Sequence, residues 1–330
     1  MTSARLLDGN WNSFCLVQQP RNVSQSDHPK YSVPTRQSPA SLTAAGQDVT
    51  NYTVENSRQQ VALVTGGGRG LGRAFAIALA QRGMRVAVAA RSVSQLDETV
   101  ALIHAEGGDA VSIPTDVTDK AAVDAMLGSV EMQLGSVDLL VNCAGTGTPF
   151  GPTWEVDSDQ WWRTMETNLK GPLLCSNAVM RGMIGRGCGR IINVCSAAGT
   201  VSIPYMSAYV TSKTALIRLT EVLADEVRKH GVSVFAIQPG TVRTAMAEEL
   251  MQSEAGDRWL PWFKRIFDER RDDPPGPGVE LVLYLASGQA DVLSGRFFAA
   301  PGVPSEVLRH EEEIRARDLH LLRMRFLDPG

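Results

Sequence analysis

Short apolar runs of strand length alternate along the chain with stretches whose apolar residues recur at helical spacing. The alternation begins at Val61 and continues to Ala300. Such alternation is typical of a parallel sheet that is covered by helices on both faces. The runs that predict strands are residues 61–65, 85–90, 110–114, 137–141, 190–195, 232–237 and 295–300. The stretches that predict helices are residues 74–82, 94–107 (with Ser94 as the cap), 119–134, 158–184, 207–230 and 279–286.

No linker or internal repeat interrupts this pattern, so we expect a single α/β domain over residues 60–302. It would be a doubly wound, mostly parallel sheet of seven strands flanked by helices. Residues 243–271 interrupt the alternation as a helical, aromatic-rich insertion, which ends at a run of prolines and glycines over residues 272–278.

Both ends of the chain depart from the pattern. Residues 1–59 are rich in Ser, Gln, Asn, Thr and Pro and predict a disordered extension. Basic residues outnumber acids up to Arg36, so a targeting role is an alternative, but no apolar core of a secretory signal is present. Residues 303–330 form a tail. Within it residues 305–326 predict a helix, because acids come first and arginines last, as a helix dipole prefers.

Composition excludes several classes of protein. A net charge of −4 with no basic stripe argues against nucleic acid or an anionic membrane as a partner. No apolar run approaches the length that crosses a bilayer. The five cysteines include no Cys-x-x-Cys pair, and we expect them to be reduced in an intracellular, cytoplasmic protein. The five histidines lack metal-ligand spacing, so no metal site is expected.

Candidate chemistry centres on Tyr209 and Lys213, which stand four residues apart in a predicted helix and so share one face. A free phenol has a pKa of about 10. A neighbouring ammonium favours the phenolate and lowers that pKa, so the pair can transfer a proton at neutral pH. Ser196, just after the fifth strand, would donate to the same substrate oxygen. Because this spacing also occurs by chance, with the ring packed and the lysine solvated, other motifs must support the assignment.

A glycine-rich turn between the first strand and the next helix predicts a dinucleotide site. Gly66, Gly70 and Gly72 would let the backbone approach a pyrophosphate at a helix N-terminus. NAD sites carry an acid near the end of the second strand, but here Arg91 follows that strand, and Arg69 lies inside the turn. Two guanidinium groups suit a 2′-phosphate, so we favour NADP(H) over NAD(H). The alternative is that both arginines are merely solvated.

The whole set of motifs resembles the short-chain dehydrogenase/reductase family, in its Thr-Gly-x-x-x-Gly-x-Gly branch, over about residues 61–300. The matching residues are Thr65, Gly66, Gly70, Leu71, Gly72, Asp116, Val117, Asn142, Ala144, Gly145, Asn168, Ser196, Tyr209, Lys213, Pro239, Gly240 and Thr244. Cys143 is a departure, because the family commonly has a second Asn there. The resemblance implies a Rossmann-like fold and a homodimer or homotetramer.

The resemblance also implies roles. Tyr209 would be the general acid/base, and Lys213 would bind the nicotinamide ribose and lower the tyrosine pKa. Ser196 would position the substrate oxygen, and Asn168 would hold a relay water. The residues expected to bind the cofactor, by motif or by charge, are Gly66, Arg69, Gly70, Leu71, Gly72, Arg91, Asp116, Val117, Asn142, Ala144, Gly145, Tyr209, Lys213, Pro239, Gly240, Val242 and Thr244.

Pro172 lies four residues after Asn168 and cannot donate to its carbonyl, so we expect a kink and a carbonyl open to water. The alternative is a kink that only improves packing.

The substrate is the least determined feature. Trp259, Trp262, Phe263 and Phe267 in the insertion, with Phe150 and Trp154, would line a pocket for an apolar or ring-bearing carbonyl or alcohol. Ordinary helix packing is an equal alternative. We therefore expect an NADP(H)-dependent oxidoreductase that transfers a hydride to or from such a carbon. The alternatives are an NADP-binding protein without turnover and an epimerase or dehydratase of the same fold.

Overall fold

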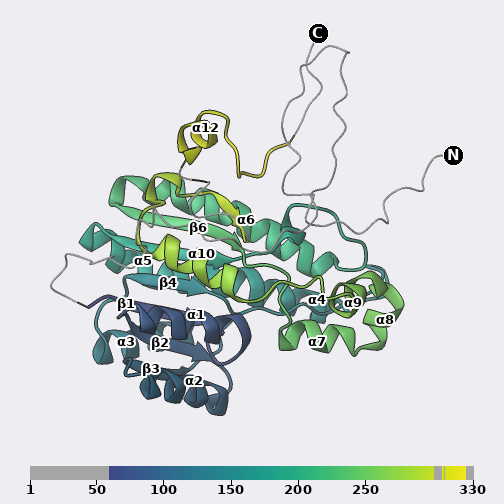
Figure 1. Ribbon diagram of the computed structural model, residues 1–330, viewed down its shortest axis with the longest axis horizontal. Coiled ribbons are helices and arrows are strands. Elements are labelled where there is room, and N and C mark those ends of the chain that lie inside the picture. The colour runs from purple at the N-terminus through teal and green to yellow at the C-terminus, as the bar shows by residue number, and fades with distance from the viewer. Residues whose placement is uncertain (1–58, 301–306, 308, 325–330) are drawn as a thin grey trace, which may run out of the picture. The chain divides into compact units, whose positions relative to one another are not determined.

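The computed structural model describes residues 59–300, 307 and 309–324. Its centre is a sheet of seven parallel strands in the order β3-β2-β1-β4-β5-β6-β7 (Figure 1). The strands are β1 (Val61–Thr65), β2 (Arg85–Ala90), β3 (Ala110–Pro114), β4 (Leu139–Asn142), β5 (Gly189–Val194), β6 (Val232–Gln238) and β7 (Phe297–Ala299). From the middle of the sheet the chain winds outward in both directions, through β1, β2 and β3 on one side and through β4 to β7 on the other. The direction of winding therefore reverses between β1 and β4. In a doubly wound sheet, ligands bind beyond the carboxyl ends of the strands at that point. The predicted fold class is confirmed.

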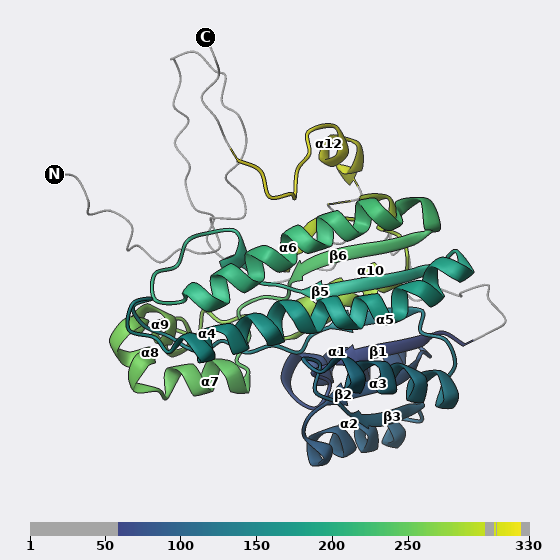
Figure 2. The ribbon, with the colours of Figure 1, turned by 180° about the vertical axis from the view of Figure 1, so that it is seen from behind.

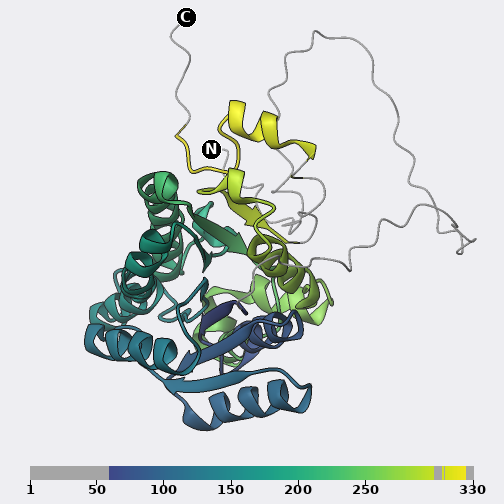
Figure 3. The same cartoon turned by 90° about the vertical axis from the view of Figure 1, so that its left-hand side faces the viewer.

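Side chains alternate between two buried faces of the sheet. On β1, Val61 and Leu63 belong to one apolar cluster, and Ala62 and Val64 belong to the other. Helices α1 (Gly70–Gln81), α2 (Val93–Ala105) and α10 (Gly276–Ala286) cover the Val64 face. Helices α3 (Lys120–Gln133), α5 (Gly171–Arg186) and α6 (Ser207–Val227) cover the Leu63 face (Figures 2 and 3). Burial on both sides explains why the strands read as nearly continuous apolar runs.

Two predicted boundaries are wrong for local reasons. Helix α1 begins at Gly70, because the glycine-rich turn itself forms the first turn of the helix. Helix α2 begins at Val93 with Ser92 as its cap, and Ser94 lies inside the first turn. The cap residue Ser92 makes no capping hydrogen bond with its side chain, so serine in this stretch was a misleading signal.

The predicted long helix over residues 158–184 is divided. Helix α4 (Ser158–Met165) passes into a π-helical turn, η2 (Glu166–Lys170), and continues as α5. The Gly171 N–H donates to the Glu166 carbonyl, five residues earlier. Pro172 follows directly and has no N–H, so the break in regular hydrogen bonding appears as a widened turn that contains Asn168.

The inserted segment after β6 forms three short helices, α7 (Ala245–Met251), α8 (Glu254–Trp259) and α9 (Pro261–Asp268). Each is too short to be stable alone, so packing must hold it in place. Among the described residues, no helix combines the length and apolar character that crossing a membrane requires.

The tail is not one long helix in the part of it that the structure describes. Helix α12 (Glu311–Ala316) ends in turns where Asp318 and His320 have φ values of 50° and 62°. The His320 carbonyl accepts from the Phe297 N–H at 2.9 Å, which covers part of the outer edge of β7. The predicted tail residues Leu308 and Phe326 lie outside the described residues. The domain boundaries at residues 59 and 303 stay predictions.

Glu221 on α6 anchors this tail. Its carboxylate is buried and accepts from the Leu322 N–H at 2.8 Å and from Arg323 Nη1 at 3.1 Å. It also pairs with Arg218, whose guanidinium donates in turn to the Leu322 carbonyl at 2.6 Å.

We expect Glu221→Ala to lower the free energy of unfolding by about 1–3 kcal/mol, because it leaves the partly buried Leu322 N–H and a guanidinium without their acceptor. Urea unfolding measures this. Glu226→Ala, an exposed acid on the same helix, is the control and should change stability by less than about 0.5 kcal/mol. Equal effects of the two variants would show that the tail contributes nothing through Glu221.

Candidate active site

The glycine-rich turn leaves the N-terminus of α1 open. The cap residue, Arg69, makes no side-chain capping bond, and the first turn contains no acid. A Cβ on Gly72 would overlap the Gly66 carbonyl oxygen, so the turn packs as closely as only glycine allows. The uncapped N–H groups and the helix dipole favour an anion. This arrangement fits the pyrophosphate of a dinucleotide.

Two side chains that the sequence analysis missed hold the carbonyls of this turn. Arg73 Nε donates to the Gly68 carbonyl and to Thr99 Oγ1, both at 3.0 Å. Thr99 Oγ1 donates to the Gly67 carbonyl at 3.0 Å, and Thr99 is fully buried. Because these carbonyl oxygens accept hydrogen bonds from side chains of α1 and α2, the conformation of the turn is fixed before a ligand binds. Arg73 lies four residues after Arg69 in sequence, but only the position of α2 reveals its partners.

The two arginines expected at a 2′-phosphate lie in different surroundings. Arg69 Nη2 pairs with Glu249 Oε1 on α7 at 3.3 Å. Arg91 is exposed at the end of β2, near Asp116. The pKa of Asp116 is lowered, chiefly by the Thr118 N–H that donates to its carboxylate at 2.9 Å, with smaller contributions from Arg91 and Lys170. Of these two arginines, Arg91 is the one that lies near Asp116.

The adjacent pair Asp116 and Val117 has structural tasks of its own. Asp116 closes a turn by accepting from the N–H and the hydroxyl of Thr118. Val117 is buried and packs against Gly171, where an added Cβ would come within 2.8 Å of the valine Cγ2. A contact of Val117 with an adenine would have to come from its backbone.

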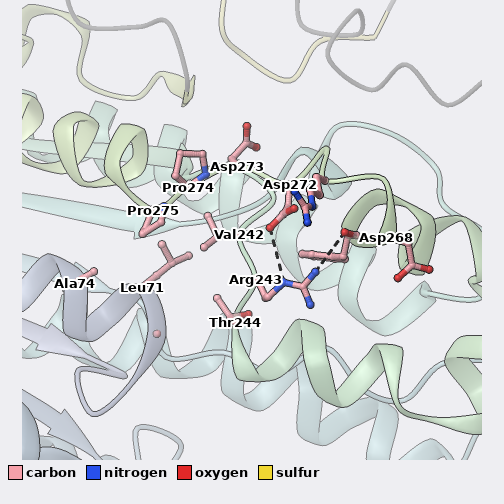
Figure 4. A pocket seen from close by; sticks show the side chains of 13 residues that line it. Leu71, Ala74, Val242, Arg243, Thr244, Asp268, Asp272, Asp273, Pro274 and Pro275 are labelled. Atoms are coloured by element: carbon pink, nitrogen blue, oxygen red, sulfur yellow. Dashed lines mark hydrogen bonds and ion pairs between the residues drawn. The ribbon is translucent and has the colours of Figure 1, made fainter.

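A cavity of about 680 Å³ brings together four of the predicted cofactor residues (Figure 4). Gly70 and Leu71 at the start of α1 form one wall, and Val242 and Thr244 form another. The rest of the lining mixes apolar residues with charged ones, and Arg243 Nε lies 3.9 Å from Asp272 Oδ2. Tyr209 and Lys213 do not line this cavity, so it belongs to the phosphate side of the candidate site.

The segment that begins at Pro239 is fixed by α10 and its preceding loop. Gly240 has a φ of 101°, and the Thr241 N–H donates to Asp273 Oδ2 at 2.7 Å. A Cβ on Gly278 would come within 2.7 Å of the Pro239 carbonyl oxygen. Thr244 Oγ1 accepts from the Ala247 N–H at 3.3 Å and so caps α7.

Strand β4 ends in a buried polar network. Asn142 Nδ2 donates to Asn193 Oδ1 on β5 at 2.8 Å, and Asn193 Nδ2 donates to Thr220 Oγ1 on α6 at 2.9 Å. Thr65 Oγ1 accepts from the N–H groups of Cys143 and Ala144 at 3.1 and 3.2 Å. These bonds hold β1, β4, β5 and α6 in register around the site, and Cys143 takes part through its backbone.

Lys213 is buried, and its ammonium donates to the Val194 carbonyl at the end of β5 at 2.8 Å. The same nitrogen lies 5.7 Å from the ring centroid of Tyr209. The structure thus brings the two residues together as predicted. Burial raises the pKa of the nearby thiols of Cys143 and Cys195 to about 12. Both thiols therefore stay protonated at neutral pH and offer no thiolate nucleophile.

Asn168 reaches the same place from the π-helical turn. Its Oδ1 accepts from the Thr146 N–H at 2.8 Å, and its Nδ2 donates to Ser212 Oγ at 3.0 Å. Ser212 Oγ donates to the Tyr209 carbonyl at 2.8 Å. A Cβ on Gly145 would meet Asn168 Oδ1 at 3.3 Å and Lys213 Nζ at 3.7 Å. Asn168, Gly145 and Lys213 are therefore neighbours, and a side chain at position 145 would crowd Asn168 Oδ1.

Ser196 follows β5 by two residues, close in sequence to the carbonyl that holds Lys213. Its Oγ accepts from the Ala198 N–H at 3.2 Å and caps the short 3₁₀ turn of Ala197–Gly199. Since this bond uses a lone pair, the hydroxyl proton can still be donated to a substrate oxygen.

An apolar cluster continues from Tyr209 to the inserted helices. Met206, Leu250 and Leu260 are buried in it. Tyr209 packs against it together with Phe150, Ile203, Val210, Trp259, Trp262 and Phe263. Trp154, which we expected in this wall, is instead 83% exposed and lies outside the cluster. Phe267 is buried in a separate apolar cluster with Ala247 and Ile266, and the Arg243 guanidinium carbon lies 4.9 Å from its ring centroid.

The sequence pattern of the family described as short chain dehydrogenase matches residues 60–255. The chain belongs to the short-chain dehydrogenase/reductase family. Among the described residues of this family member, no cluster of His, Cys, Asp and Glu could hold a metal ion.

Three similar proteins illustrate the breadth of the family. The 2-(S)-hydroxypropyl-CoM dehydrogenase 3 of Xanthobacter autotrophicus is 35% identical over 74% of this chain and 96% of that protein. A crystal structure of a variant actinorhodin polyketide ketoreductase with NADPH has a TM-score of 0.70 and 31% identity, over 74% of this chain and 96% of that one. An NAD⁺-bound xylitol dehydrogenase has a TM-score of 0.68 and 29% identity, over 74% and 98%.

Arg73→Met should weaken the binding of NADPH and NADH alike, by roughly tenfold, because it removes charge-assisted bonds that fix the turn. Fluorescence titration with each dinucleotide measures the two dissociation constants. Arg82→Met, at the exposed end of the same helix, is the control and should leave both unchanged. A loss for NADPH alone would assign Arg73 to the 2′-phosphate and contradict its bracing role.

Proposed function

We propose that this chain is an NADP(H)-dependent reductase of apolar or ring-bearing carbonyl compounds, with Tyr209 as the general acid/base. The proposal depends chiefly on one observation. Lys213, Asn168 and Gly145 meet beside Tyr209 at the carboxyl edge of the sheet, next to an open glycine-rich turn. The cofactor, when bound, supplies or accepts the hydride. Every other task falls to side chains of the chain.

Tyr209 donates its phenolic proton to the substrate oxygen in the direction of reduction and removes it in the direction of oxidation. Ser196 donates a second hydrogen bond to that oxygen and stabilises its developing negative charge. The buried Lys213 ammonium favours the phenolate of Tyr209 after the proton has left. Its partner, the Val194 carbonyl, keeps the ammonium in place. Lys213 would also bind the nicotinamide ribose.

We propose that Asn168 connects this centre to solvent through a relay water, as the family resemblance implies. Its side chain is fully engaged by Thr146 and Ser212, so its own position is fixed. The π-helical turn that contains it widens the hydrogen-bonding pattern next to Pro172, which supports a backbone carbonyl that is open to water.

The preference for NADP(H) is supported by charge. No acid follows β2, where NAD-binding sites commonly place one, and the exposed Arg91 stands there instead. Arg69 would need to leave Glu249 to contribute. The similar structures include complexes of both dinucleotides, so this preference depends on Arg91. The expected homodimer or homotetramer is proposed on the family resemblance alone. The cytoplasmic location is proposed because the five cysteines include no Cys-x-x-Cys pair and are expected to be reduced.

Tyr209→Phe should reduce NADPH oxidation by at least about a hundredfold while the dissociation constant of NADPH stays within about twofold, because only the acid/base group is removed. Absorbance at the nicotinamide band measures turnover with a panel of cyclic and open-chain ketones. Unaltered turnover would refute the mechanism. NADPH binding without oxidation by the unmodified protein would favour a binding protein, and substrate conversion without net NADPH consumption would favour an epimerase or dehydratase.

Arg91→Ala should weaken NADPH binding by about tenfold or more and leave NADH binding nearly unchanged, because only NADPH carries the phosphate. Parallel titrations with the two dinucleotides decide this. Equal losses, or none, would refute the assignment of cofactor preference to Arg91.

A further inference from the structure

Tyr205 holds an unusual backbone conformation just before the catalytic helix. Its φ is 69°, a region that residues other than glycine seldom occupy and that costs on the order of 1–3 kcal/mol. It precedes the α6 cap, Met206, and stands four residues before Tyr209. Such strain persists only where surrounding contacts impose it.

Contacts from two separate segments hold Tyr205 in this conformation. The Gly151 N–H, on the loop after β4, donates to the Tyr205 carbonyl at 2.9 Å. From the inserted helices, the Trp259 ring packs on the Tyr205 ring with the centroids 4.7 Å apart and the planes at 35°. Gly151 also lies against Trp259, because a Cβ there would be 3.7 Å from the indole Nε1. Three segments distant in sequence therefore meet at this ring pair.

The pair is not buried in the core. Tyr205 is 37% exposed, and Trp259 is half-buried, with the Arg258 guanidinium carbon 4.6 Å from its ring centroid. Behind the pair, Trp259 joins the apolar cluster that includes Phe150 and Tyr209. Trp259 thus packs in the same apolar cluster as the proposed acid/base, Tyr209.

We propose that Tyr205 and Trp259 form an aromatic clasp that determines substrate specificity. The clasp presents ring faces to a planar, ring-bearing carbonyl compound and favours it over an open-chain one. This inference rests on the proposed function, because it concerns the substrate of the same site. Because Tyr205 is 37% exposed, part of its surface is accessible to a ligand. Ring stacking requires an accessible aromatic face.

The test compares 1-tetralone, a bicyclic aromatic ketone, with 2-decanone, an open-chain ketone of equal carbon number. The full-length protein, NADPH and the variant Trp259→Leu are used. We expect the ratio of kcat/KM for 1-tetralone over 2-decanone to fall by about three- to tenfold. This factor corresponds to the free energy of one aromatic contact. The dissociation constant of NADPH should not change, because neither ring lines the glycine-rich turn.

Trp162→Leu is the matched control. Trp162 is also exposed and also packs on an aromatic ring, with its centroid 5.2 Å from that of Trp161, but it lies outside the cluster at Tyr209. It should leave the ratio unchanged. Trp259→Phe keeps a ring and should retain most of the preference, which guards against a Trp259→Leu variant that folds poorly. An unchanged ratio in folded Trp259→Leu, or an equal fall in Trp162→Leu, would overturn the clasp.

Failure of the proposed function is distinguishable from failure of the clasp. If the unmodified protein reduces neither ketone, binding of 1-tetralone to the protein saturated with NADP⁺ is measured by calorimetry. Binding that is lost in Trp259→Leu and kept in Trp162→Leu would support the clasp without turnover. No binding of 1-tetralone to the unmodified protein would overturn it.

Discussion

The site depends on the buried ammonium of Lys213. A charge removed from water must find a partner, and here the partner is the Val194 carbonyl at the end of β5. That bond fixes α6 along the sheet, and a second tie from Asn193 to Thr220 fixes it two turns further on. Because both ties are buried, sliding of the helix would leave polar groups unpaired. Tyr209, on the first turn of α6, is therefore held at the carboxyl edge of the strands.

In the glycine-rich turn the same need to pair polar groups has another consequence, because here backbone donors are left without a partner. Arg73 and Thr99 engage its carbonyl oxygens, whereas the N–H groups at the start of α1 have no side-chain cap, and the first turn of the helix contains no acid. Because its carbonyl oxygens are occupied and its N–H groups are free to donate, the turn is prepared to bind an anion. In the proposed function, phosphate binding thus falls to backbone fixed by one helix, and proton transfer to side chains fixed by another.

The substrate side is built differently. The walls that we propose for it come from short helices α7, α8 and α9 and from the loop after β4, which contribute to an apolar and aromatic cluster. An apolar contact keeps most of its stabilising energy when one apolar side chain replaces another. A buried hydrogen-bond network loses more, because a changed side chain leaves polar groups unpaired. One scaffold can therefore keep its acid/base centre while the walls vary, which agrees with the different names of the similar proteins.

The sequence by itself determined the order of the strands along the chain, the two-sided burial of the sheet and the pairing of Tyr209 with Lys213. These features follow from periodicity and from fixed helical spacing, which are local. Only the tertiary structure decided what depends on segments far apart. In the folded chain Arg69 pairs with Glu249, Arg73 donates to the Gly68 carbonyl, and Trp154 lies in solvent. The tertiary structure also ended the tail helix α12 at Ala316 and placed the His320 carbonyl against β7, because an exposed strand edge offers hydrogen bonds that a continuing helix cannot use.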